Sequence, residues 1–557
     1  MAITKVTGAM LGNYVGGSAD DTVVVGDGAG DAITTGVDNT LIGDNAGTAL
    51  TEGSDNVAIG NEALAANTTG TKNTTVGKSA GAAITTGEKN VLIGYNSGKL
   101  TTIGIKNVAV GSYSLDANTE GENNVAIGQS ALGANTTADN NTGVGINSLT
   151  SNTTGTENVA VGKDALKVNT TGSYNTAVGG YGTLDANTTA NNNTAIGAGV
   201  MTANTTGAAN TAVGAYSLDA NTEGDDNVAV GYAALSSNTT ADYNTAVGRS
   251  ALGANTTGSQ NTAVGQNAGD AITTGSANTC LGQASLSNTT TSNNNTAIGV
   301  DALTANTTGS ENQAFGIYAL DGCTTGTNNT AVGYHALGGV TTSANNTGLG
   351  FRAGQAITTG TQNTSIGTSS GATVTTGSYN TYVGQDCRGS ASDVEYETVI
   401  GYNQVGQGDG KLTYGKSGAY TTLTAGSTTV GSSSDKRIKE NIQDSTAGLS
   451  FINDLQPKIF EYKKKKDVDP VLTEEYKKGS EERVKGRSGL QHGFIAQEVK
   501  EAIDKHPEIK EGFDGWEENP SGVQIVGESA FIPMLVKAVQ ELSAQVEELK
   551  AQINEEK

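Results

Sequence analysis

The sequence predicts a mainly β protein, built as a long parallel β-solenoid and followed by a small α+β unit that ends in a coiled-coil helix. Three observations support this prediction: a pentamer that recurs every 17 residues, a change of composition near residue 433, and heptad spacing of apolar residues at the C-terminus. They divide the chain into an attachment segment at 1–21, a shaft at 22–401, a β-rich distal tip or connector at 402–433, and a charged unit at 434–557.

The shaft repeat has the consensus N-T-A-V-G-x-x-A-L-x-A-N-T-T-G-x-x and begins 23 times between Thr22 and Glu397. Every step is 17 residues except one of 18, which places one inserted residue in the region of Gly180 to Thr183. Dense Gly and Asn and abundant β-branched residues disfavour a helix. Coils that stack about 4.8 Å apart would give a shaft of roughly 110 Å. The shaft contains no Pro, as expected if each coil donates N–H groups to the next.

Two repeat positions hold in all copies, because the fourth residue is always apolar and the fifth is always Gly. We expect the fourth residues to stack inside the solenoid, and the glycine to form a corner that a Cβ would block. A core of one Val and one Leu per coil is thin. We therefore expect contacts between chains to bury the remaining apolar surface, which makes the protein an oligomer.

Positions nine and twelve exchange side chains between copies. Most copies have Leu at nine and Asn at twelve, but six have Gly at nine and an aliphatic residue at twelve. These six pairs are Gly30 with Ile33, Gly47 with Leu50, Gly81 with Ile84, Gly269 with Ile272, Gly354 with Ile357, and Gly371 with Val374. We therefore expect positions nine and twelve to fill one core pocket at near-constant volume.

Individual repeat residues give weak functional signals. Asn67 begins an N-T-T glycosylation sequon, but a polar Asn/Thr ladder on a solenoid face is the favoured interpretation. Cys280, Cys323 and Cys387 replace small or apolar residues, which favours packing over reactivity. His335 occupies a variable position and is expected to be exposed rather than a ligand. We expect no cofactor and no metal, and no carboxylate pair marks a site that cleaves polysaccharide.

The charge distribution limits the partners. Residues 434–557 hold 25 acidic and 19 basic residues, and residues 1–433 hold 31 and 13, so the two parts carry −6 and −18. This acidic balance argues against nucleic acid and anionic membranes as partners. No secretory signal and no membrane span is expected. Three cysteines without a CxxC pair favour assembly in a reducing cytoplasm.

The end of the chain predicts a helix with one apolar seam. Apolar residues recur there at alternating steps of three and four, as in a coiled coil. They are Ile532, Leu535, Val539, Leu542, Val546, Leu549 and Ile553. The earlier Lys463–Lys466 run, with EEYKKGSEERVKGRSG after it, is predicted to be a solvated loop. The segment KLTYGKSGAYTTLTAGSTTVG within 402–433 alternates like strands.

Two resemblances refine this description. The units NVAIG at 56–60 and 124–128 resemble the N-S-V-A-I-G repeats in the heads of trimeric autotransporter adhesins, which form trimeric left-handed β-rolls. The blocks SDKRIKENI from Ser434, GFIAQEV from Gly493 and IPMLVKAVQEL from Ile532 resemble the endosialidase-type intramolecular chaperone of phage tail fibres and tailspikes. The heptad seam alone does not fix the number of strands, so the trimer follows from these resemblances.

The chaperone resemblance implies a domain that trimerises, guides the folding of the fibre, and then cuts itself off between Ser433 and Ser434. The family's Ser–Lys dyad falls on Ser434 and Lys439, where a partly desolvated Lys would accept the Ser proton. Asp435 and Arg437 are then expected to position the segment. His492 and Glu498 are the remaining supporting residues, with His492 orienting the site. By itself, the segment from Ser434 to Glu440 also fits a polar linker before a helix start.

These expectations describe a homotrimeric phage tail fibre that binds a bacterial surface receptor, most simply a glycan. Its short N-terminal segment would attach to the tail, the baseplate or an adaptor protein, and the fibre would assemble in the host cytoplasm before joining the virion. Single-turnover self-cleavage is the only enzyme activity expected. The alternatives are a tailspike depolymerase, which would show aromatic and carboxylate clusters, and a bacterial trimeric adhesin, which would need a signal peptide and a membrane anchor.

Overall fold

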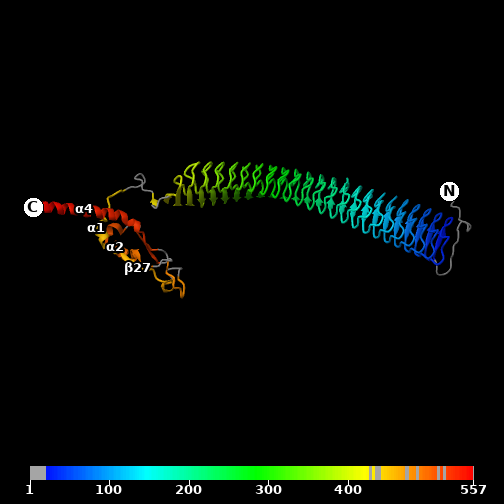
Figure 1. Ribbon diagram of the computed structural model, residues 1–557, viewed down its shortest axis with the longest axis horizontal. Helices are drawn as coiled ribbons and strands as arrows, with labels where there is room; N and C mark the ends of the chain where they lie inside the picture. Colours follow the sequence, from blue (N-terminus) through cyan, green and yellow to red (C-terminus); the bar gives the residue numbers. More distant parts are fainter. Residues whose placement is uncertain are drawn as a thin grey trace. The chain divides into compact units, whose positions relative to one another are not determined.

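The computed structural model describes residues 21–425, 430–432, 441–470, 476–484, 489–510, 513, 515–518 and 522–555. The chain forms two compact units, residues 1–433 and 434–557. Figure 1 shows the first unit as a row of stacked coils with its strands aligned along one side.

Each coil contributes one short strand. The strands are β1 (Val23–Val25), β2 (Thr40–Ile42), β3 (Val57–Ile59), β4 (Thr74–Val76), β5 (Val91–Ile93), β6 (Val108–Val110), β7 (Val125–Ile127), β8 (Thr142–Val144), β9 (Val159–Val161), β10 (Thr176–Val178), β11 (Thr194–Ile196), β12 (Thr211–Val213), β13 (Val228–Val230), β14 (Thr245–Val247), β15 (Thr262–Val264), β16 (Thr279–Leu281), β17 (Thr296–Ile298), β18 (Gln313–Phe315), β19 (Thr330–Val332), β20 (Thr347–Leu349), β21 (Thr364–Ile366), β22 (Thr381–Val383) and β23 (Thr398–Tyr402).

Consecutive strands pair in parallel with every residue opposite its repeat equivalent, as Val57, Ala58 and Ile59 face Thr74, Thr75 and Val76. The 18-residue step keeps this register, since Thr176 still faces Thr194. The predicted β-solenoid of 17-residue coils is therefore confirmed, and its strands occupy positions two to four of the repeat.

The side of the strand that faces the core differs from the prediction. Position three is buried, as at Ala58, whereas position four points outward, with Ile59 36% exposed. Successive strand residues alternate between faces, so only one of two adjacent apolar positions can be inside. The expected internal stack of fourth residues is wrong, because the small residue at position three fills the interior of these narrow coils.

Two asparagine ladders run inside the shaft. At position one, Asn56 is fully buried. Its backbone N–H donates to Asn39 Oδ1 at 3.0 Å, and its Nδ2 donates to the carbonyl of Gly70 at 3.0 Å. At position twelve, Nδ2 of Asn135 donates to Asn118 Oδ1 at 2.9 Å. These ladders pair polar groups that would otherwise be buried without partners.

The ladders correct the prediction of an Asn/Thr ladder on a solenoid face. Asn67, which begins the sequon, is fully buried and exchanges hydrogen bonds of 2.9 Å with Gly70. The first ladder starts at Thr22, whose Oγ1 accepts from the Asn39 N–H at 3.3 Å, and ends at Glu397, whose N–H donates to Asn380 Oδ1 at 2.8 Å.

The glycine at position five forms the predicted corner. Gly60 has φ of 137°, and a Cβ there would lie 2.5 Å from the carbonyl oxygen of Gly77 in the next coil. The exchange of positions nine and twelve is also confirmed, because a Cβ on Gly81 would lie 3.0 Å from Cδ1 of Ile84. A seventh glycine at position nine, Gly98, was not part of the predicted set, and there Leu92 from position three fills the pocket.

The sheet of the shaft continues into three further strands, as the alternation within 402–433 predicted. β24 (Lys411–Lys416) pairs in parallel with β23, β25 (Ala419–Thr424) pairs antiparallel with β24, and β26 (Val430–Ser432) pairs antiparallel with β25. The three cysteines are free and buried, so the packing interpretation is confirmed. Burial raises the pKa of the Cys280 thiol to about 12.

The C-terminal unit has α+β structure. Its elements are α1 (Leu449–Asp454), β27 (Lys458–Phe460), η2 (Lys465–Asp467), β28 (Gln491–Gly493), α2 (Ala496–Lys505), α3 (Pro507–Lys510), β29 (Trp516–Glu518), β30 (Gln524–Val526), η4 (Glu528–Phe531) and α4 (Ile532–Glu555). Phe451 is its fully buried centre, and Phe494 and Phe531 pack together with ring centroids 5.5 Å apart.

Candidate functional site

The predicted cleavage residues lie outside the described part of the chain. Ser433, Ser434, Asp435, Arg437 and Lys439 all belong to the undescribed stretch 433–440. The dyad and its cleavage bond therefore remain predictions from the sequence.

The two remaining supporting residues lie on neighbouring elements. β27 and β28 are antiparallel, with Ile459 opposite His492. His492 is exposed, and Glu498 lies in the first turn of α2. The structure pairs Glu498 with Lys458 of β27, at 3.3 Å between Nζ and Oε2. Lys458 belongs to none of the three sequence blocks, so the blocks alone could not indicate it.

The last sequence block has a structural role that its pattern does not reveal. Glu541 of α4 accepts the N–H of Leu449 at 2.8 Å and so caps the first turn of α1. Gly448 permits this contact, because a Cβ there would lie 2.4 Å from Glu541 Oε2. A carboxylate at a helix N-terminus is favourable, so Glu541 attaches α1 to α4.

A buried histidine connects three elements of the same unit. His506 follows α2, and its Nε2 lies 2.8 Å from Asp454 Oδ2 at the end of α1, while its Nδ1 lies 2.9 Å from Glu508 Oε1 on α3. Burial alone would lower the pKa of His506, but the hydrogen bonds to Asp454 and Glu508 outweigh it, so the pKa is raised. Two carboxylate partners favour the doubly protonated imidazolium.

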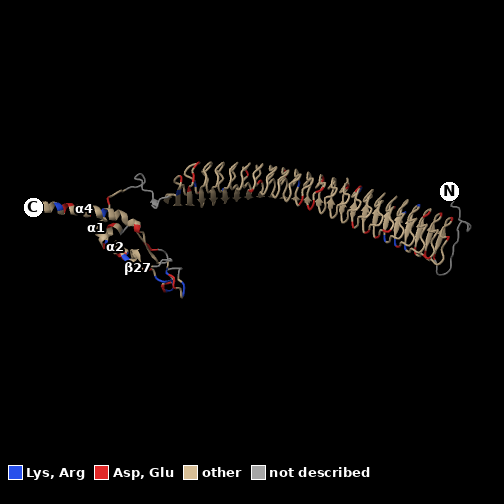
Figure 2. Cartoon of the chain, viewed as in Figure 1, with Lys and Arg blue, Asp and Glu red and all other residues tan. Residues whose placement is uncertain are grey.

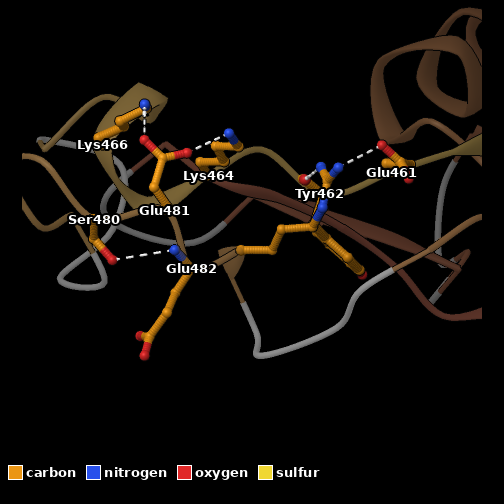
Figure 3. A network of polar contacts seen from close by, with 8 residues as sticks. Glu461, Tyr462, Lys464, Lys466, Ser480, Glu481 and Glu482 are labelled. Atoms are coloured by element: carbon orange, nitrogen blue, oxygen red, sulfur yellow. Dashed lines mark hydrogen bonds and ion pairs between the residues drawn. The ribbon is translucent and has the colours of Figure 1, made fainter.

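The described side chains of the predicted solvated loop are exposed or half-buried, and its backbone is locally paired; residues 471–475 and 485–488 lie outside the described part of the chain. Lys464 and Arg483 form an antiparallel bridge, and the Lys465 N–H donates to the Glu482 carbonyl at 2.7 Å. Figure 3 shows Glu481 between Lys464 and Lys466, with both lysines paired to it.

The same region ends in a second ion pair, between Arg483 Nη2 and Glu461 Oε2 at 2.6 Å. The two lysines lower the pKa of Glu481 to about 2, chiefly through their hydrogen bonds. Among the described residues, three lysines of the predicted loop are therefore paired with its glutamates, and charged residues gather at this end of the unit in Figure 2.

Both units present an unpaired apolar row. In the shaft, fourth residues such as Ile127 (39% exposed) and Ile196 (40%) recur along the strand face. In the C-terminal unit, α4 is a helix over the predicted seam, and all seven seam residues are exposed. Leu535 also lines an apolar cavity of about 350 Å³ with Ile452, Phe494 and Phe531. Extended apolar surfaces of this kind are rarely exposed on monomeric soluble proteins.

His335 departs from the expectation of an exposed side chain. Its imidazole is only 25% exposed and its Nε2 lies 3.7 Å from Asp321 Oδ2. Within the described residues, no group of three or more His, Cys, Asp or Glu side chains is placed to hold a metal ion. None of the described helices is long and apolar enough to pass through a bilayer.

Comparison with known proteins identifies the C-terminal unit. Residues 434–506 match the family model described as the chaperone of endosialidase. No curated protein and no solved structure matches the chain. The match begins at Ser434, the first residue of the second compact unit.

A segment similar to the endosialidase chaperone therefore follows a long β-solenoid shaft in this chain. That combination is consistent with a protein of the phage tail-fibre or tailspike type.

Proposed function

We propose that this protein is the homotrimeric tail fibre of a phage, which attaches the virion to a receptor on the bacterial surface. The observation that carries this proposal is the chaperone match, which begins at Ser434 and so follows a highly repetitive solenoid. In this proposal the N-terminal segment joins the fibre to the tail, the baseplate or an adaptor, and the described shaft reaches outward from the virion.

The trimer is supported by the two exposed apolar rows. A charged or polar strand face could remain exposed to water in a single chain. Strands β1 to β22 contain no charged residue. Figure 2 agrees, because the charges along the shaft lie outside the strands. Burial of apolar surface contributes about 25 cal/mol per Å². Three chains that turn their fourth residues toward a common axis would bury the shaft row, and three α4 helices would bury the seam.

The repetitive shaft explains why a chaperone would be needed. Neighbouring coils are nearly identical, so a shift of one coil between chains would cost little free energy. Long-range parallel pairing also folds slowly. A C-terminal unit that joins three chains in register would remove the slipped alternatives before the shaft folds.

Release would then make the assembly irreversible. Ser434 is proposed to attack the carbonyl carbon of Ser433 while Lys439 accepts the hydroxyl proton, which gives an ester between the two parts. Breaking the Ser433–Ser434 peptide bond frees the amine of Ser434, and water hydrolyses the ester. The shaft would then have lost the clamp that set its register.

The test is the mass of the full-length protein under denaturing and native conditions, for the wild type and for Ser434→Ala. We expect the wild type to split after Ser433, the variant to remain whole, and both shafts to have the native mass of three chains. A monomeric shaft in either sample would contradict the proposal. If the wild-type protein stays uncleaved but has the native mass of a stable trimer, the trimer is supported and the Ser–Lys dyad is rejected.

A further inference from the structure

Two clusters of exposed aromatic and arginine side chains recur on the shaft. The first contains Tyr216, Tyr232 and Arg249, at positions seven, six and six of three consecutive coils. Tyr216 and Tyr232 meet edge to face with centroids 5.9 Å apart, and the Arg249 guanidinium lies 6.0 Å from the centre of the Tyr232 ring. Both tyrosines are about half exposed, at 50% and 53%.

The second cluster repeats this arrangement on coils that begin 102 residues, or six repeats of 17, further along. Tyr318 and Tyr334 meet edge to face at 6.0 Å. Tyr334 then stacks on Phe351 at 5.4 Å, and the guanidinium of Arg352 lies 5.1 Å from the Phe351 ring centre. His335 lies beside both tyrosines, at 6.2 and 6.1 Å between ring centres.

Both clusters lie at the same place on the coil. Positions six and seven directly follow the glycine corner, so they extend from the edge of the strand face rather than from its centre. Six coils at about 4.8 Å separate the clusters by roughly 29 Å along the shaft. Equivalent positions in a parallel stack fall on one line, so a linear polymer lying along the shaft would reach both clusters.

The charges indicate what such a polymer would carry. Residues 1–433 contain only three arginines, and two of them, Arg249 and Arg352, belong to these clusters. Neither forms an ion pair with any residue that the structure describes. The third, Arg388, donates to Asn403 Oδ1 at 3.3 Å. A guanidinium held against a ring presents its N–H groups to a planar carboxylate, and on this acidic shaft it offers a local positive site.

We propose that the two clusters are binding sites for a linear polysaccharide with carboxylate-bearing sugars, which lies along the shaft and contacts both. Exposed aromatic rings pack against the C–H faces of sugar rings, and the arginine pairs with a sugar carboxylate. This inference rests on the proposed function and specifies the chemistry of the bacterial receptor.

The experiment measures binding of the full-length protein to immobilised alginate, a linear polyuronate, and to dextran, a neutral polysaccharide, at 0.15 M salt. We expect alginate to bind at least tenfold more tightly than dextran. Arg249→Ala alone should weaken binding by about 100-fold, because it leaves one site on each chain and removes the avidity of two linked sites along that chain. Arg249→Ala with Arg352→Ala should reduce binding to the dextran level.

A ring variant and a matched control complete the design. Tyr232→Ala with Tyr334→Ala should weaken alginate binding as much as loss of both arginines. Tyr243→Ala removes a tyrosine that is 61% exposed in the same coil as Tyr232, at position seventeen, and should bind like the wild type.

Three results would overturn the proposal. One is equal or absent binding of alginate and dextran by the wild type. Another is loss of binding in Tyr243→Ala. The third is loss of the trimer in the ring variant, because the clusters would then be contacts between chains. Self-cleavage and native mass are measured on the same samples, so failure of the receptor chemistry is distinguished from failure of the fibre proposal.

Discussion

Gly269 and Ile272 share one pocket of the shaft, since a Cβ on Gly269 would lie 3.0 Å from Cδ1 of Ile272. Ile272 also interrupts the second asparagine ladder. Asn255 is the preceding member, and its Oδ1 is buried without a hydrogen-bond partner in the described structure. The coil thus replaces one polar rung with one apolar side chain, and glycine at position nine makes room for it.

This relationship predicts a compensating pair of substitutions. Gly269→Leu alone should destabilise the shaft by about 1–3 kcal/mol, because the pocket is already filled. Adding Ile272→Asn restores the common pattern and offers an Nδ2 donor to Asn255, so it should recover most of the loss. Local stability is best followed by amide hydrogen exchange of coils near residue 270. If the double variant is no more stable than Gly269→Leu, the shared pocket is not what couples the two positions.

The exposed fourth residues predict a defect confined to assembly. Ile127→Asp should leave the coil fold intact, because the side chain points away from the core, yet it should prevent trimer formation by burying three unpaired carboxylates. Native mass and circular dichroism would show folded single chains. The matched control is Thr137→Asp, an exposed position of the same coil, which should still form trimers. A trimeric Ile127→Asp protein would place the chain contacts elsewhere.

The proposed dyad predicts loss of cleavage for two lysine substitutions. Lys439→Gln should abolish cleavage because no base remains. Lys439→Arg should also fail although it keeps the charge, since a guanidinium does not lose its proton near neutral pH. Denaturing mass measurements over several days would record both. Cleavage in Lys439→Arg would exclude proton transfer to this side chain.

The histidine between Asp454 and Glu508 predicts a pH-dependent C-terminal unit. The pKa of His506 is raised in the folded state. His506 therefore stabilises the fold fully below its unfolded pKa of about 6.5. This contribution is lost as the pH rises through the pKa of His506 in the folded state. The pKa of Glu508 is lowered, so its contribution is present above its unfolded value of 4.5 and is lost as the pH falls. Stability should therefore be greatest between these two limits.

Trp516 provides the measurement, because it is the only tryptophan and packs against the core of this unit. Its fluorescence should give a midpoint of thermal unfolding that falls from pH 6 to pH 8 in the wild type. His506→Gln keeps a polar side chain and should flatten this slope, and His492→Gln, at an exposed site, should not. If the unfolding midpoint of all three proteins falls equally with pH, His506 is not the origin of the pH dependence.

The repeat period predicted most of the shaft because it fixes which residues stack. The stacked coils, the glycine corners and the exchange of positions nine and twelve all follow from copies of one unit. The prediction that position four points into the core was wrong, because positions three and four of most coils are both apolar. The width of the closed coil decides that Ala58 and not Ile59 fits inside.

Contacts between different elements were beyond the reach of sequence patterns. The clusters of Tyr216 and Tyr318 join side chains at variable positions from three coils, although tyrosines that recur at positions six and seven were a usable signal. The contact of His506 with Asp454 spans 52 residues and depends on how α1 packs beside α2. Likewise, no spacing rule indicates that Glu541 caps α1, because the two helices lie at opposite ends of the unit's sequence.

Because every coil pairs with the next in the same register, the repeat also affects how the gene can evolve. Each coil offers the next one the same strand edge, the same asparagine acceptor and the same glycine corner. A recombination event that adds or deletes one whole coil would therefore create no unfamiliar contact on either side of the junction. The length of this shaft can change in evolution by discrete increments of about 4.8 Å, and under the proposed function the reach of the fibre would be a trait that a single crossover adjusts.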